Sequence, residues 1–131
     1  MIGVWGSQAQ NFLLALGCAT FLAFSIPITF APLRWARLFL WEIPATTDLT
    51  IYFGRCLGAF AIILNIFMLR AALTGAAIET VFEFMMLVWV FMIAVHVVGA
   101  LQRIQPITET IEILFWILLA LLTAAFWPTA I

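Results

Sequence analysis

The third apolar stretch of the chain decides the fold class, and it reads TVFEFMMLVWVFMIAVHVVGAL from Thr80 to Leu101. It holds one glutamate and one histidine among residues that are otherwise apolar or small. A helix needs roughly 20 apolar residues to cross the ~30 Å hydrocarbon core of a bilayer. The stretch therefore predicts a membrane-spanning helix at residues 80–101.

Three further stretches, at residues 7–30, 49–73 and 108–127, have the same apolar character. Over the whole chain 67% of the residues are hydrophobic and 8% are charged, whereas about a quarter of the residues of a soluble domain are charged. We therefore expect one transmembrane domain over residues 1–131. Its fold class is all-α, an integral membrane four-helix bundle that leaves no room for a soluble catalytic domain.

A short amphipathic segment separates the first two expected spans. Residues 32–41 read PLRWARLFLW, which places two arginines three residues apart on one helical face. Arginine stems can extend to lipid headgroups, and indole rings favour the membrane–water interface. We expect a short interfacial helix here and five interfacial anchors in the chain: Arg34, Trp35, Arg37, Trp41 and, at the opposite side of the membrane, Trp127.

The arginines also predict an orientation. Four of the five basic residues lie near the connection between the first two spans or between the last two, and Arg70 alone lies near the other side. The positive-inside rule then places both connections in the cytoplasm and both termini outside it. The net charge is −1 and the chain has no basic run, so nucleic acid is not an expected partner.

Four ionisable side chains are expected at one depth in the membrane. Arg55 comes from the second span, His96 from the third, and Glu109 and Glu112 from the fourth. Because successive spans alternate in direction, the span ends that carry these residues meet at the same face. Since pairing offsets part of the cost of burying charges, we expect an ion pair between Arg55 and Glu112 with His96 beside it.

Two interpretations of this polar cluster stay open. It can fix the register of the helices, or it can bind a lipid-soluble molecule or handle a proton, since histidine exchanges protons near neutral pH. A metal ion is not expected, because the chain has neither an HExxH nor a Glu-x-x-His spacing. No cofactor is identified, although a lipophilic ligand fits the second interpretation.

Several short motifs from Trp41 onward carry a family resemblance. They are a connection with Trp and Pro, YFGRCLG at residues 52–58, and His96-x-x-Gly99-Ala100 before a short turn. With these motifs the chain resembles the small DoxX-like bacterial membrane proteins, and it is more weakly similar to four-helix scaffold proteins of sterol biosynthesis. The resemblance implies a four-helix bundle in a bacterial inner membrane and an accessory role. It identifies no catalytic residue.

These observations lead to two function classes. We expect first a non-enzymatic accessory or scaffold subunit that packs against a larger membrane complex, because no nucleophile–base or metal spacing is present. The alternative is a binding protein or enzyme for a quinone, sterol or carotenoid, held near Arg55, His96 and Glu112. The expected partners are the lipid bilayer and either other membrane subunits or further copies of the chain.

Overall fold

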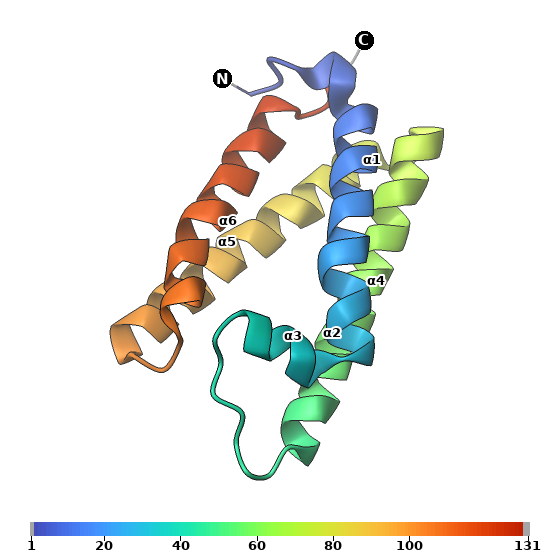
Figure 1. Cartoon of the computed structure of the whole chain (residues 1–131). Coiled ribbons are helices and arrows are strands. Elements are labelled where there is room, and N and C mark those ends of the chain that lie inside the picture. Colours follow the sequence, from blue (N-terminus) through green and yellow to red (C-terminus); the bar gives the residue numbers. More distant parts are fainter. Residues whose placement is uncertain (1, 130–131) are drawn as a thin grey trace.

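The structure of the protein is a computed structural model that describes residues 2–129. All regular elements in this range are helical (Figure 1), which confirms the all-α class. Four continuous segments are long and apolar enough to cross a membrane, and they coincide with the expected spans to within two residues at each end. These segments are Gly6–Phe30, Asp48–Thr74, Ile78–Gln102 and Ile107–Ala125.

The first long segment changes its helical pitch near Pro27. It consists of a 3₁₀ turn η1 (Gly6–Gln8), α1 (Ala9–Thr20), a π-helical turn η2 (Phe21–Ser25) and α2 (Ile26–Phe30). Pro27 has no N–H for the carbonyl of Ala23, and the wider turn before it lets the helix continue past this gap. The indole Nε1 of Trp35 lies 3.4 Å from that carbonyl oxygen.

A short helix, α3 (Pro32–Leu38), follows directly and lies beside the ends of α2 and α4 (Asp48–Thr74). It ends three residues earlier than the expected segment 32–41, because the chain turns at Leu40, where φ is 62°. Arg34 and Arg37 are exposed on α3. The connection after α3 then crosses toward the start of the last helix.

The long helices pack as two pairs that diverge toward the end of the molecule carrying α3 (Figure 1). The segment from α1 to α2 lies along α4, and α5 (Ile78–Gln102) lies along α6 (Ile107–Ala125). At the other end the pairs share a core of buried side chains, which includes Leu13, Met68, Phe82 and Met85. The described ends of the chain also meet there, since the backbone N–H of Gly3 donates to the Ala124 carbonyl at 2.9 Å.

Two glycines allow α2 and α3 to approach α4 closely. A Cβ added to Gly54 would lie 2.6 Å from the Cβ of Pro32, and one added to Gly58 would lie 2.7 Å from the backbone nitrogen of Thr29. Glycines four residues apart are a common contact surface between membrane helices, because no side chain separates the backbones. This surface holds the first helix pair together near α3.

Buried polar groups join the same pair in mid-helix. Asn65 of α4 is only 2% exposed. Its Oδ1 accepts a hydrogen bond from Ser25 Oγ at 2.5 Å, and its Nδ2 donates to Thr20 Oγ1 at 2.6 Å. Such interhelical bonds contribute about 0.6–2 kcal/mol in membrane proteins. The position of α4 against the first segment is therefore set by small residues and by this polar contact.

Candidate functional site

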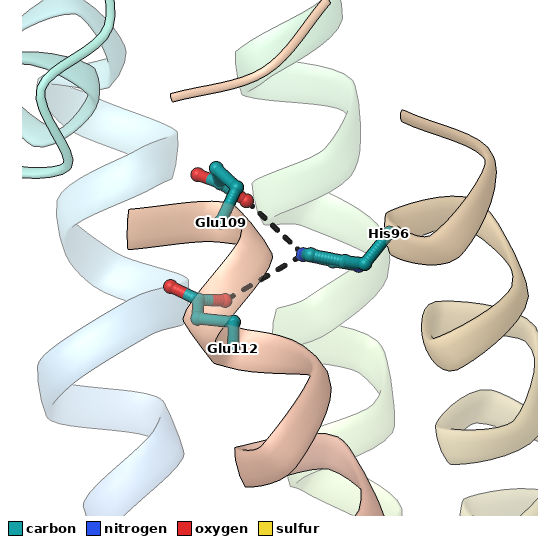
Figure 2. A group of neighbouring side chains, drawn as sticks. All are labelled: His96, Glu109 and Glu112. Atoms are coloured by element: carbon teal, nitrogen blue, oxygen red, sulfur yellow. Dashed lines mark hydrogen bonds and ion pairs between the residues drawn. The ribbon is translucent and has the colours of Figure 1, made fainter. Parts of the chain in front are cut away.

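A histidine and two glutamates meet between α5 and α6. His96 lies near the end of α5, and Glu109 and Glu112 lie on successive turns at the start of α6 (Figure 2). The Nε2 atom of His96 is 3.0 Å from Glu109 Oε2 and 3.6 Å from Glu112 Oε2. His96 is 5% exposed and Glu109 is 9% exposed. We refer to these three residues as the His–Glu cluster.

The turn between the two helices brings the cluster together. Gln105 folds back over this turn, and its Nε2 donates to the His96 carbonyl at 3.0 Å and to Thr110 Oγ1 at 3.1 Å. A Cβ on Gly99 would lie 2.9 Å from the Cδ of Gln105. Glycine at this position therefore leaves the space in which Gln105 ties the end of α5 to the start of α6.

Two further contacts orient the His96 ring. Its Nδ1 lies 2.7 Å from the carbonyl oxygen of Met92, which can only accept a hydrogen bond, so Nδ1 carries a hydrogen. The indole Nε1 of Trp116, which can only donate, lies 3.3 Å from Nε2. Both contacts favour the neutral ring whose lone pair is on Nε2.

In this tautomer the His96 ring is neutral, so it supplies no positive charge opposite the carboxyl groups of Glu109 and Glu112. In this tautomer Nε2 has no hydrogen to donate to Glu109 Oε2, which lies 3.0 Å away, and an ionised carboxylate can also only accept hydrogen bonds. Facing acceptors repel each other in a poorly solvated place. The geometry is favourable when a proton lies between them, on His96 or on Glu109, or when a bound cation contacts both.

Trp41 completes the surroundings of Glu109. Its indole Nε1 donates to Glu109 Oε1 at 2.7 Å, from 68 residues away in the sequence. Beside it, Thr108 Oγ1 donates to the Phe39 carbonyl, which ties the connection after α3 to α6. The sequence suggested for Trp41 only a role as an interfacial anchor. No local pattern predicts its contact with Glu109, because the two residues are joined only through the tertiary fold.

Aromatic rings close the cluster on the side of the core. The ring of Trp116 lies 5.7 Å from the His96 ring and stacks on Trp89 at 5.5 Å. Trp89 in turn donates to the buried Thr123 Oγ1 at 2.9 Å. Trp116 is one helical turn after Glu112, so a spacing of four residues on α6 is the sequence signal that links it to the site.

An open hollow of about 440 Å³ adjoins the cluster on another side. The lining residues with polar side-chain atoms are Trp41, His96, Gln105 and Glu109. The rest of its lining is mainly apolar and includes Val95, Val98 and Ile104. Polar groups are thus gathered at one point of an otherwise apolar surface.

Arg55 does not belong to this cluster, and the expected ion pair with Glu112 is not formed. Within residues 2–129 the ion pairs are those of His96 with the two glutamates. Arg55 lies instead beside Arg34 at a second hollow of about 430 Å³, between the α2–α3 junction and α4. The alternation of helix direction correctly implies a common end of the molecule, but α4 packs against α2 and α3, whereas α6 packs against α5.

The remaining expected anchors lie apart from the cluster. Trp35 stacks on Phe39 at 4.3 Å. Trp127 follows the end of α6, opposite to α3 in the molecule, and packs edge-on against Phe82 at 5.9 Å. Both rings therefore make contacts within the protein as well as lying near helix ends.

Comparisons with protein-family models, with curated proteins and with solved structures found no match. The DoxX-like resemblance therefore stays a prediction from short sequence motifs: the connection with Trp and Pro, residues 52–58, and His96 to Ala100. A fold of this kind does not by itself imply a function. The function of this chain is therefore inferred from the geometry of the His–Glu cluster and the hollow beside it.

Proposed function

We propose that this chain is a multi-pass membrane protein that binds a lipid-soluble molecule between α5 and α6. Large apolar side chains cover the outer surface of all its long helices; Phe60, Phe91 and Leu114, for example, are 73%, 67% and 70% exposed. Continuous apolar surfaces of this size require a lipid or protein environment. Arg34 and Arg37 on α3 would then lie among lipid headgroups, at the cytoplasmic face if the arginine bias holds.

The observation that carries the binding proposal is that the buried side chains of His96 and Glu109 line an otherwise mainly apolar hollow. Ligand sites are typically hollows of about 300–1,000 Å³ with apolar walls and a few converging polar groups. The hollow beside His96 and Glu109 has a volume of about 440 Å³. Its apolar walls suit a ring or chain, and its polar end suits one hydroxyl or carbonyl group.

The chemistry of the cluster narrows the ligand class. His96 Nε2 and Glu109 Oε2 can accept a hydrogen bond from a hydroxyl group, and once protonated either can donate one to a carbonyl. A sterol or a quinone presents such a group at one end of an apolar body, whereas a hydrocarbon carotenoid presents none. We therefore favour a sterol-like or quinone-like ligand. The same residues could exchange a proton with it.

Purification in a mild detergent from the native membrane tests the proposal. Extraction of the purified chain and mass spectrometry should find one lipophilic molecule per chain. Glu109→Gln and His96→Phe should each reduce its occupancy several-fold, because they remove the polar end of the site. Glu83→Gln is the matched control, since Glu83 is an exposed glutamate near the other end of α5. This variant should retain the ligand.

The same purification distinguishes the accessory-subunit hypothesis. A larger membrane protein that co-purifies in stoichiometric amount, with no lipophile on the isolated chain, would overturn the binding proposal. Loss of the lipophile in Glu83→Gln to the same extent as in Glu109→Gln would also overturn it, because binding would then be unrelated to the cluster.

A further inference from the structure

We propose that His96, Glu109 and Glu112 bind one divalent transition-metal ion. The inference concerns the same cluster as the lipophile site, but it does not depend on it. One nitrogen and two carboxylate oxygens, one atom from each residue, all lie within 4.8 Å of one another. Sequence spacing did not indicate this site, because its donors come from two helices and meet only after the turn at Gln105.

The distances between the donor atoms fit a metal ion. Zinc–nitrogen and zinc–oxygen bonds are about 2.0–2.2 Å, so two ligand atoms of a tetrahedral site lie ~3.4 Å apart. The observed distances from His96 Nε2 to the two Oε2 atoms, 3.0 Å and 3.6 Å, bracket this value. The donor atoms of the two glutamates lie within 4.8 Å of each other, so binding of one ion by all three residues needs rotation of the glutamate side chains.

The outer hydrogen bonds orient the donors as in known metal sites. A metal-binding histidine usually donates its other ring N–H to a carbonyl or carboxylate, which fixes the tautomer. The Nδ1 of His96 is placed to do so with the Met92 carbonyl at 2.7 Å. Ligand carboxylates are in turn hydrogen-bonded, as Glu109 Oε1 is by Trp41 at 2.7 Å. The 3.3 Å contact between Trp116 and Nε2 is long, and a metal would replace it.

A divalent ion can offset more negative charge at the cluster than a single proton can. A proton shared between His96 and Glu109 neutralises one carboxylate. Glu112 has 20% of its side chain exposed. Among residues 2–129 no arginine pairs with it, because Arg55 lies beside Arg34 at the hollow between the α2–α3 junction and α4. A divalent cation neutralises both carboxylates with a neutral imidazole as the third ligand.

The donor set indicates the class of metal. Ca²⁺ and Mg²⁺ prefer oxygen donors throughout, and Cu⁺ prefers sulfur. One imidazole nitrogen with two carboxylate oxygens suits Zn²⁺, Mn²⁺, Fe²⁺ or Co²⁺. Three protein ligands leave at least one coordination position for water or another molecule.

The test uses the full-length, untagged chain in detergent, first stripped of metal with a chelator. Titration with Co²⁺ should give visible d–d absorption bands that saturate at one ion per chain, and Zn²⁺ should displace them. Zn²⁺ should also raise the thermal unfolding temperature of the wild type. Glu112→Gln, which keeps the shape of the side chain, should weaken binding by at least roughly tenfold.

Two further variants distinguish a specific metal site from non-specific metal binding. Trp41→Phe keeps an aromatic ring but removes the donor to Glu109, and should weaken Co²⁺ binding by about tenfold through orientation of the carboxylate. Glu83→Gln should bind Co²⁺ like the wild type. Equal binding by the wild type and by Glu112→Gln would identify an adventitious ion only and overturn the proposal.

The wild-type titration keeps the test decisive if a variant does not fold. Absence of saturable Co²⁺ bands in the folded wild type, with no effect of Zn²⁺ on its unfolding, would mean that the cluster holds a proton rather than a metal. Metal binding in a chain that carries no lipophile would instead support this inference and count against the proposed function. The two proposals can therefore fail separately.

Discussion

The two ring nitrogens of His96 have different partners, and this difference determines which atom contacts the glutamates. Its Nδ1 is held by the Met92 carbonyl, so only Nε2 is directed toward Glu109 and Glu112. Removal of any one member of such a group changes the environment of the others, and the effects of mutations on stability are then not additive. Residues that share no partner, such as Arg55 and Glu112, should behave independently.

Double-mutant cycles measured by thermal unfolding in detergent test this distinction. The losses from His96→Ala and Glu109→Ala should differ from additivity by about 0.5–3 kcal/mol, because each variant leaves a buried polar partner. The losses from Arg55→Ala and Glu112→Ala should add to within about 0.5 kcal/mol. Strong coupling between Arg55 and Glu112 would show that the two side chains do interact and would contradict their separation.

Among the elements, the close approach of α2 to α4 depends on Gly58. A Cβ at this position would lie 2.7 Å from the nitrogen and 2.8 Å from the Cα of Thr29, both backbone atoms that cannot turn aside. At Gly17, where α1 contacts α4, the nearest atom to an added Cβ is the Leu69 side-chain Cδ2 at 3.2 Å, which can move. The two glycines are both buried, but they tolerate a methyl group differently.

Gly58→Ala should therefore destabilise the protein more than Gly17→Ala. Both changes gain the same ~1 kcal/mol of intrinsic helix preference, so their difference isolates the steric effect. We expect Gly58→Ala to be about 1–3 kcal/mol less stable than Gly17→Ala, because the helix pair must separate. Loss of helical circular dichroism on titration with SDS measures this difference. Equal stability would show that α2 and α4 are not in backbone contact.

For the whole molecule, the even number of long helices places both described ends of the chain together. The N-terminal segment pairs with the end of α6, and α3 and the α5–α6 turn lie at the opposite end (Figure 1). Four arginines lie toward the α3 end, and Arg70 lies toward the other. In a membrane these two ends would face opposite compartments.

Cysteine labelling in intact cells tests the orientation. Cys18 and Cys56 are first replaced by alanine, and single cysteines are then introduced at exposed positions, Ile2, Thr46, Ile104 or Thr129. An impermeant maleimide added outside should modify Ile2→Cys and Thr129→Cys, because the arginine-rich end is expected in the cytoplasm. Labelling of only Thr46→Cys and Ile104→Cys would mean that the protein has the inverse orientation.

The sequence by itself determined the four long helices and the common end of the polar residues. Helix length followed from the apolar runs, which match bilayer thickness, and the alternation of direction placed His96, Glu109 and Glu112 at one end. It could also indicate that Asn65 makes a polar contact, since a buried amide in an apolar helix requires a partner.

Only the tertiary structure decided which of these residues touch. The apolar runs of the sequence predict how deep in the membrane each residue lies. Which helices lie side by side depends on how their side chains pack. Gly58 and Asn65 hold α4 against the first segment, which keeps Arg55 away from Glu112. The connection after α3 crosses to α6 and brings in Trp41. Because these contacts join residues far apart in the chain, no local pattern encodes them.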